Sequence, residues 1–180
     1  MNALRRAVFL DRDGVLNEAV VRDGKPYSPA GLDELAVPAD VPDALRTLRA
    51  AGFALIVVTN QPNVARGIQP RTAVEEIHAT LRAQLPLDDI LVCYHDDRDG
   101  CSCRKPQPGL LLRAAAEHRI DLARSFMVGD RWRDVEAGRR AGCLTVRVEG
   151  HYREDGPETP PDYIAHSLSD AASWILRRTQ

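Results

Sequence analysis

The sequence predicts an α/β protein with a doubly wound, mostly parallel, Rossmann-like sheet, and three observations lead to this fold class. Short apolar runs alternate with amphipathic helical patterns along the 180 residues. The apolar runs are continuous rather than alternating, which is typical of strands buried on both faces. Polar residues directly follow several runs, as they do where ligands bind beyond the carboxyl ends of parallel strands.

The expected elements follow from these patterns. Five apolar runs and one expected edge strand lie at 7–10, 53–58, 90–93, 125–128, 144–148 and 163–165. In the first expected helix, apolar residues fall on one face and Gly52 follows as a stop signal. The expected helices lie at 42–51, 72–85, 109–118, 133–141 and 168–178. The segment 150–161 is the most loop-like stretch.

The composition favours a single globular domain over residues 1–180. Hydrophobic residues make up 44% and charged residues 28%, and the net charge of −2 argues against a large nucleic-acid interface. No apolar run approaches the roughly 18 residues that a membrane helix needs. The first ten residues carry no cleavage-site pattern. We therefore expect a cytoplasmic monomer whose partner is a small molecule.

Chemically active side chains gather where the expected strands end. Parallel strands bring their carboxyl ends to one edge of the sheet, so residues after different strands meet there. No glycine-rich loop of the Walker type is present, which excludes that class of nucleotide triphosphatase. The residues expected at this edge are Asp11, Asp13, Thr59, Asn60, Lys105, Asp130 and Asp134.

This set of residues fits phosphoryl transfer to a carboxylate. Asp11 is ionised at pH 7 without help and can attack phosphorus, provided that Mg²⁺ and a lysine reduce the repulsion between anions. Asp13 can protonate the leaving alkoxide and then activate water. Asp11 and Asp130 offer the hard oxygen ligands that Mg²⁺ prefers. Thr59 and the backbone near Asn60 can donate hydrogen bonds to the phosphate.

Four motifs in this order resemble those of the haloacid dehalogenase-like phosphohydrolases. Each motif alone is common in turns, but their joint occurrence at strand-associated positions is not. They are Asp11-Arg12-Asp13-Gly14-Val15, Thr59-Asn60, Lys105, and Gly129-Asp130 with Asp134.

The resemblance implies a role for each motif. Asp11 would be the nucleophile and Asp13 the general acid and base, while Thr59 and Lys105 would hold the phosphoryl group. Mg²⁺ would bind Asp11, the carbonyl oxygen of Asp13, and Asp130. Asp134 would support the site from outside the metal ligands. Since only about 40 residues separate the first two strands, we expect no large cap domain.

A second metal site is expected in the segment 93–103. Cys93, His95, Cys101 and Cys103 offer three thiols and one imidazole within a few residues. This is a ligand set for tetrahedral Zn²⁺ with no position left open for chemistry. The alternatives are unrelated thiols or a disulfide, and a reducing compartment favours metal. Cys143 is expected to be a core thiol.

The zinc-loop pattern resembles two families of small phosphatases, which act on D-glycero-D-manno-heptose 1,7-bisphosphate and on histidinol phosphate. Thr59-Asn60-Gln61, Ala65-Arg66-Gly67 and Pro108-Gly109 are more similar to the heptose family. Three features depart from that family: Pro62-Asn63 in place of Ser-Gly, Arg131 in place of Lys, and a longer loop at 18–38.

Charge also distinguishes these two substrates. A bisphosphate needs cations for its second phosphate, and a fork of arginines suits that group. The candidate contacts are Gln61 and the arginines Arg12, Arg66, Arg104 and Arg131. The ammonium group of histidinol phosphate would need a carboxylate, and the candidates are Glu18, Asp23, Asp33 and Glu34. We expect removal of the C7 phosphate of the heptose bisphosphate, because Arg104 is tethered between Cys103 and Lys105.

Two interpretations from other classes are less favoured. A phosphoacceptor signalling domain shares the doubly wound sheet, an acidic cluster, a threonine and a lysine. Such domains lack a D-x-D motif after the first strand, and rapid turnover of a phosphate ester would separate the two classes. A non-catalytic zinc-stabilised binding module would not need Asp11 and Asp13.

Overall fold

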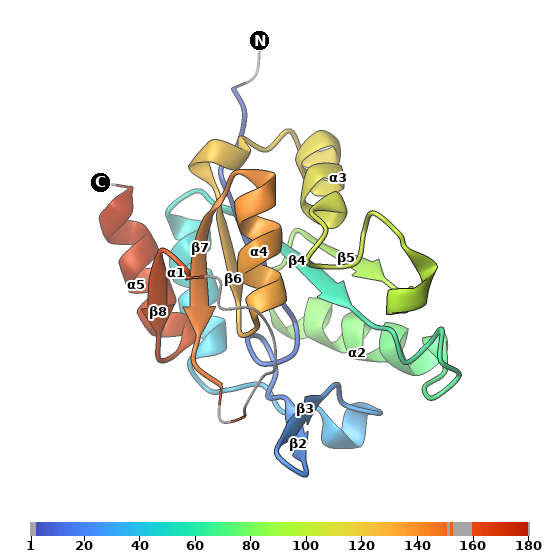
Figure 1. Cartoon of the computed structure of the whole chain (residues 1–180). Helices are drawn as coiled ribbons and strands as arrows, with labels where there is room; N and C mark the ends of the chain where they lie inside the picture. The colour runs from blue at the N-terminus through green and yellow to red at the C-terminus, as the bar shows by residue number, and fades with distance from the viewer. Residues whose placement is uncertain (1–2, 151, 153–159, 180) are drawn as a thin grey trace.

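A six-stranded parallel sheet forms the centre of the protein in a computed structural model that describes residues 3–150, 152 and 160–179 (Figure 1). The strand order is β5-β4-β1-β6-β7-β8, and each neighbouring pair is parallel. The strands are β1 (Ala7–Leu10), β4 (Ala54–Asn60), β5 (Asp89–Cys93), β6 (Phe126–Gly129), β7 (Leu144–Val148) and β8 (Tyr163–Ala165). The predicted doubly wound sheet is confirmed.

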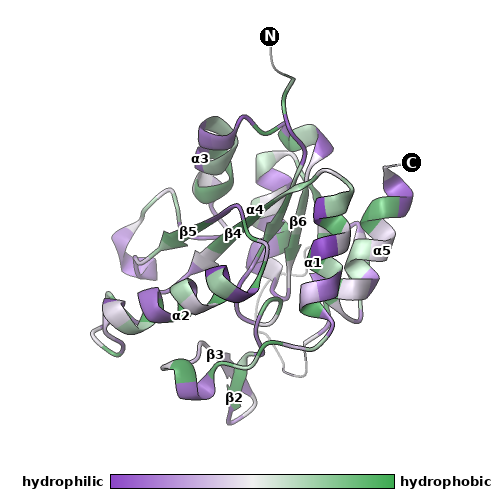
Figure 2. Cartoon of the chain, turned by 180° about the vertical axis from the view of Figure 1, so that it is seen from behind, coloured by the Kyte–Doolittle hydropathy of each residue, from purple (hydrophilic) through white to green (hydrophobic). Residues whose placement is uncertain are grey.

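Helices cover both faces of the sheet, as Figures 1 and 2 show from opposite sides. One face carries α1 (Val41–Ala50), α2 (Arg71–Gln84) and α5 (Leu168–Arg178). The other carries α3 (Gly109–His118) and α4 (Trp132–Ala141). The described residues contain no large cap domain.

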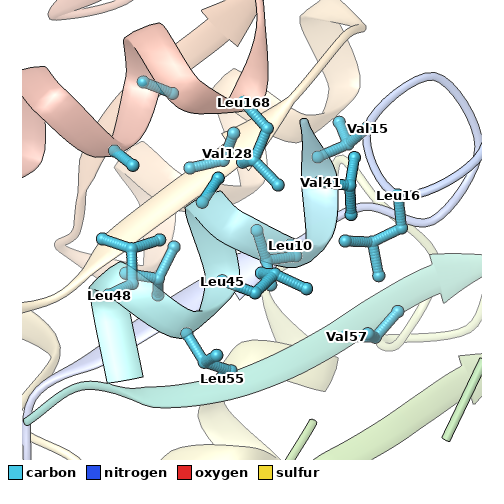
Figure 3. Close-up of a cluster of buried hydrophobic side chains, with 14 of the residues drawn as sticks. Leu10, Val15, Leu16, Val41, Leu45, Leu48, Leu55, Val57, Val128 and Leu168 are labelled. Atoms are coloured by element: carbon cyan, nitrogen blue, oxygen red, sulfur yellow. The ribbon is translucent and has the colours of Figure 1, made fainter. Parts of the chain in front are cut away.

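The strand β1 contributes side chains to two hydrophobic cores, because successive side chains point to opposite faces of the sheet. Val8 and Leu10 belong to the core under α1, α2 and α5, part of which is drawn in Figure 3. Ala7 and Phe9 belong to the core under α3 and α4. All four side chains are fully buried. This two-sided burial explains the continuous apolar runs and holds the end of β1 rigidly.

The long first loop differs from expectation, because it contains a hairpin of β2 (Val20–Arg22) and β3 (Lys25–Tyr27) and a 3-10 turn at Leu32–Glu34. Asp23 and Gly24 form the hairpin turn, and both have positive φ, at 52° and 73°. An Asp-Gly pair is a strong hairpin signal, so the sequence did contain this information. The hairpin lies beside the carboxyl edge of the main sheet (Figure 1).

Other differences are small. The second strand extends to Asn60, so that Thr59 and Asn60 are its last residues rather than the residues after it. The segments Asp97–Asp99 and Leu122–Arg124 form short 3-10 helices that were not predicted. Most of the predicted loop 150–161 lies outside the described residues. Within the part of the chain that the structure describes, no helix is both long and apolar enough to cross a membrane.

Candidate active site

The predicted site residues meet at the carboxyl edge of the sheet, beside a pocket of about 270 Å³. Asp11 directly follows the central strand β1, Asn60 ends the neighbouring β4, and Asp130 follows β6 on the other side. The hairpin contributes Tyr27 and Ser28 to the pocket wall. The fold therefore brings three strand ends and the first loop together around one space.

A buried lysine joins two carboxylates at the base of this pocket. Lys105 Nζ lies 2.8 Å from Asp11 Oδ1 and 2.6 Å from Asp134 Oδ1, and it also donates to the carbonyl oxygen of Val58 at 2.7 Å. Burial alone would lower the pKa of Lys105, but Asp11 and Asp134 raise it above its ordinary value. The lysine is therefore a permanent cation fixed at the nucleophile candidate.

Three carboxylates form a candidate site for a hard cation. Asp11, Asp130 and Asp134 each offer an oxygen atom, and these atoms lie within 4.8 Å of one another. Asp130 Oδ1 is buried and has no hydrogen-bond partner, so it is an acceptor that a bound cation would satisfy. The arrangement of hard oxygen donors fits Mg²⁺.

The raised pKa values of two carboxylates in this cluster indicate that a bound cation would stabilise their ionised forms. Burial, followed by repulsion from Asp134, raises the pKa of Asp11 to about 7, against the opposing effect of Lys105. Burial also raises the pKa of Asp130 well above its usual value, with further contributions from Asp11 and Asp134. Carboxylates this close disfavour one another's ionised form.

Two glycines allow this close approach of backbone and carboxylates. Gly14 has a φ of 83°, and a Cβ atom there would lie 2.0 Å from Asp130 Oδ2. A Cβ atom on Gly129 would lie 2.1 Å from the Cβ of Asp134. Any larger residue at either position would displace a carboxylate of the cluster.

Asp13 lies beside this cluster with both oxygens held by hydrogen bonds. Arg12 donates to it from Nε at 3.0 Å and from Nη2 at 3.1 Å, and the Asn17 amide donates at 3.0 Å. Ser28 Oγ donates at 2.8 Å and Gln61 Nε2 at 2.9 Å. Although burial would raise the pKa of Asp13, Arg12 and these amides hold it below its ordinary value. The carboxylate is therefore ionised and fixed in one orientation.

Arg12 and Gln61 do not lie where a substrate contact was expected. Both side chains are fully buried, and each donates hydrogen bonds to Asp13. The prediction that Arg12 helps to hold a second phosphate is therefore wrong, because its guanidinium is paired beneath the pocket. Gln61 also donates to Thr59 Oγ1 at 2.9 Å, which links the expected phosphate-binding turn to Asp13.

Asn60 joins the end of β4 to the segment that carries the lysine. Its Nδ2 donates to the carbonyl oxygen of Lys105 at 3.1 Å, and its Oδ1 accepts from the backbone N–H of Lys105 at 3.1 Å. The Asn60 side chain therefore positions Lys105, while Thr59 is buried and is not among the residues that line the pocket.

Arginines line the outer wall of the pocket and share one carboxylate. Asp97 accepts from Arg104 at 2.9 Å and from Arg133 at 3.1 Å, and Arg66 lies 3.4 Å from it. The main partner of Arg66 is Asp96, at 3.0 Å from its Nε. Arg131 also lines the pocket. Arg133 was missed by the sequence analysis, although it lies two positions beyond Arg131 in the first turn of α4. The wall carries more positive than negative charge.

The carboxylates of the first loop lie elsewhere. Glu34 pairs with Arg22 and accepts from the backbone N–H of Ala30, and both contacts are exposed. Among the described residues that line the pocket, the carboxylates are Asp11, Asp13, Asp97, Asp130 and Asp134. None of the four candidates for binding an amine is in this set.

The four expected zinc ligands converge on one point. The Sγ atoms of Cys93, Cys101 and Cys103 and the Nδ1 atom of His95 lie between 2.9 and 3.7 Å apart in the pairs that make contact. Zinc bonds of about 2.0–2.3 Å would place tetrahedral ligands roughly 3.3–3.8 Å apart. All three cysteines are free thiols, as is the buried Cys143. Three of the five distances lie in this range and two are shorter, and the four side chains are of the types that bind zinc.

Comparisons with known proteins identify relatives of this chain. Residues 102–171 match the model of the HAD-hydrolase-like family. The chain is 37% identical to D-glycero-beta-D-manno-heptose-1,7-bisphosphate 7-phosphatase of Escherichia coli K12, over 96% of this chain and 94% of that one. It is 35% identical to the D-glycero-D-manno-heptose-1,7-bisphosphate 7-phosphatase of Thermosynechococcus vestitus, over 95% of each chain.

A solved structure shows the same likeness in three dimensions. The D,D-heptose 1,7-bisphosphate phosphatase of B. bronchiseptica, complexed with magnesium and phosphate, superposes with a TM-score of 0.82. Its sequence identity is 30%, with 96% of this chain and 99% of that chain covered. The fold and the acidic site thus define a haloacid dehalogenase-like hydrolase. Within that superfamily, the chain belongs to the D-glycero-D-manno-heptose-1,7-bisphosphate 7-phosphatase family.

Proposed function

We propose that this protein is a Mg²⁺-dependent phosphatase that removes the C7 phosphate of D-glycero-D-manno-heptose 1,7-bisphosphate through an aspartyl-phosphate. The observation that carries this proposal is the arrangement of Asp11 between Lys105 and Asp130, with the separately held carboxylate of Asp13 beside it. Two carboxylates that are held separately in one pocket can supply a nucleophile and an acid–base group.

In the first step, Asp11 attacks phosphorus and the bond from phosphorus to the ester oxygen breaks. Lys105 holds the attacking carboxylate in place, and Thr59 with the backbone at Asn60 donates to the phosphoryl oxygens. Asp13 gives a proton to the departing alkoxide. It takes up that proton when the anionic ester binds, because the like charge of the phosphate raises the pKa of a neighbouring carboxylate.

In the second step, water attacks phosphorus and the bond to Asp11 breaks, which releases inorganic phosphate. Asp13 accepts the proton of this water. The hydrogen bonds from Arg12, Asn17 and Gln61 lower the pKa of Asp13 and so favour its basic form after the alcohol has left. One carboxylate therefore serves both steps.

The proposed metal ligands are Asp11, the carbonyl oxygen of Asp13, and Asp130, and Asp134 holds Lys105. When bound there, Mg²⁺ would neutralise phosphoryl charge and satisfy the buried Asp130 Oδ1. Zinc would bind Cys93, His95, Cys101 and Cys103 and fix the loop that leads into Arg104 and Lys105. Its role would be structural, because four protein ligands leave no open position.

Charge in the pocket wall supports the bisphosphate as substrate. Arg66, Arg104, Arg131 and Arg133 all line the pocket, and three of them share Asp97. A second phosphate can replace Asp97 as the partner of these guanidinium groups. Histidinol phosphate offers no second anion, and the loop carboxylates that could meet its ammonium group do not line the pocket.

Phosphate release from the two substrates tests this assignment. We expect a higher kcat/KM for the bisphosphate, and Arg104→Ala should raise KM for it far more than for a monophosphate. Arg113→Ala is the matched control, since Arg113 is exposed and pairs with Glu117 on α3. Asp11→Asn should abolish turnover of both esters. Preference for histidinol phosphate, or an equal effect of Arg104→Ala on both ester types, would overturn the assignment to the heptose.

We also propose that residues 1–180 act as one domain, as a monomer in the cytoplasm. The continuous six-stranded sheet and the pocket built from one chain support the single domain and the monomer. Light scattering at the concentration used for kinetics should give a mass near 19.9 kDa. A mass twice that value at the same specific activity would contradict the monomer.

A further inference from the structure

Asp13, the general acid–base candidate, is held by the buried Arg12, and Arg12 in turn contacts His78. The Arg12 side chain is fully buried, with Nε and Nη2 on the carboxylate of Asp13. Its third nitrogen, Nη1, lies 3.0 Å from Nε2 of His78, a residue 66 positions away on α2. Arg12 therefore lies between Asp13 and a helix from another part of the chain.

The chemistry of this contact fixes the form of the imidazole. A guanidinium has only donors, so Nε2 of His78 must accept and the ring proton must be on Nδ1. The ring is therefore neutral. Its surroundings agree: burial and the nearby charge of Arg12 lower the pKa of His78 to about 4. His78 is 1% exposed, so no bulk water replaces it as an acceptor.

The contact also fixes the plane of the guanidinium. Arg12 presents a rigid fork, and a bidentate pair with Asp13 sets the orientation of both groups together. If the acceptor at Nη1 were removed, a buried donor would lose its partner, at a cost that favours rotation of the guanidinium. Asp13 would then lose the two hydrogen bonds from Arg12, and its orientation would shift toward that set by Asn17, Ser28 and Gln61. A displacement of about 1 Å at an acid–base group can lower a rate about a hundredfold.

We propose that His78 is a positioning residue for phosphoryl transfer, which orients Asp13 toward the leaving oxygen by anchoring Arg12 at Nη1. This inference rests on the proposed function of Asp13 as the general acid. His78 touches neither Asp13 nor the pocket and acts only through Arg12. If His78 were purely structural, it would only fill space on the buried face of α2. Removal of its acceptor atom would then leave catalysis unchanged.

A matched pair of substitutions separates these roles. His78→Gln keeps an acceptor at nearly the position of Nε2, whereas His78→Met has a similar length and no comparable acceptor. Each variant is assayed for kcat/KM with the heptose bisphosphate, which is an alkyl phosphate at C7, and with p-nitrophenyl phosphate. An alkoxide needs its proton far more than p-nitrophenolate does, so a misplaced acid slows the alkyl ester selectively. Because kcat/KM reports steps up to departure of the alcohol, slow hydrolysis of the intermediate does not mask the effect.

We expect His78→Met to lower kcat/KM about tenfold or more for the alkyl ester and less than about threefold for the aryl ester. His78→Gln should restore most of the alkyl activity. The ratio of the two rates in one preparation does not depend on the fraction folded. If the methionine variant does not fold, the ratio is read from His78→Asn, whose shorter amide does not reach Nη1. His118→Met, on α3, is the control and should leave the ratio unchanged.

The outcomes are distinct. Equal losses for both esters, or equal behaviour of the glutamine and methionine variants, would overturn the positioning role while leaving the phosphatase intact. A wild-type protein that hydrolyses neither ester would instead contradict the proposed function, and this inference with it.

Discussion

Lys105 Nζ lies 2.8 Å from Asp11 Oδ1, although 94 positions separate the two residues in the sequence. The lysine reaches the end of β1 because the Asn60 amide donates to the carbonyl oxygen of Lys105 and accepts from its backbone N–H. The ammonium group of Lys105 also contacts Asp134 and donates to the carbonyl oxygen of Val58. One buried cation thus connects the ends of β1 and β4 with the start of α4.

Replacement of this cation should nearly abolish phosphatase activity. Lys105→Met keeps the length of the side chain but leaves Asp11 and Asp134 without their shared partner. We expect kcat/KM to fall at least about a hundredfold, which corresponds to about 3 kcal/mol of transition-state stabilisation. Lys25→Met is the control, since Lys25 is exposed on the hairpin. Activity within tenfold of the wild type would show that Lys105 is not at the reacting phosphate.

Binding of Mg²⁺ should weaken as pH falls through about 7. Burial and the charge of Asp134 raise the pKa of Asp11 to about 7 in the metal-free protein, so a proton competes with the metal below that pH. We expect the affinity to fall about tenfold per pH unit for each proton displaced, and to level off at higher pH. Calorimetry from pH 5.5 to 8.5, in buffers of different ionisation enthalpy, measures both the affinity and the protons released. An affinity that does not change with pH would contradict the pKa of Asp11.

The sequence predicted the fold and the inner part of the site because both follow from local signals. Each buried strand is a continuous apolar run, and the residues at its carboxyl end must lie at one edge of the sheet. The structure brings Asp11 and Asp130 together at this edge and Cys93, His95, Cys101 and Cys103 together in a second cluster, as their order and spacing indicated. Lys105 was expected at this edge because it lies between the third and fourth apolar runs and matches one of the four motifs.

The missed features depend on side-chain direction, which spacing does not reveal. Arg12 follows Asp11 directly and could have faced the pocket or the core, and the structure places it in the core. Its partner His78 lies on a helix face that sequence periodicity marks only as buried. Ser28 reaches Asp13 because the Asp23-Gly24 turn folds the hairpin back over the site.

Loss of one thiol at the proposed zinc site should reduce both metal content and catalysis. Cys101→Ala removes a ligand only four residues before Lys105, so zinc should fall well below one per chain and kcat should fall indirectly. Each lost kcal/mol lowers Tm by about 2–4 °C in a protein of this size, so we expect a drop of several degrees. Cys143→Ala should retain the metal, because Cys143 is a buried thiol outside the cluster. Elemental analysis that finds no zinc in wild-type protein purified without chelators would contradict the site.

Stability at acid pH should depend on His78. The pKa of His78 is about 4 in the folded protein and about 6.5 when unfolded, so the unfolded chain binds more protons between these values. The free energy of unfolding is therefore unaffected by this titration above pH 6.5. It falls as the pH drops toward 4, by about 3 kcal/mol, which corresponds to a pKa difference of two and a half units. Urea unfolding of wild type and His78→Gln should show this as a difference that shrinks or reverses between pH 7 and pH 4, because glutamine does not titrate. A constant difference across this range would mean that the imidazole has the same pKa in the folded and unfolded protein. It would then be protonated near pH 4, and Arg12 would have no acceptor at Nη1 there.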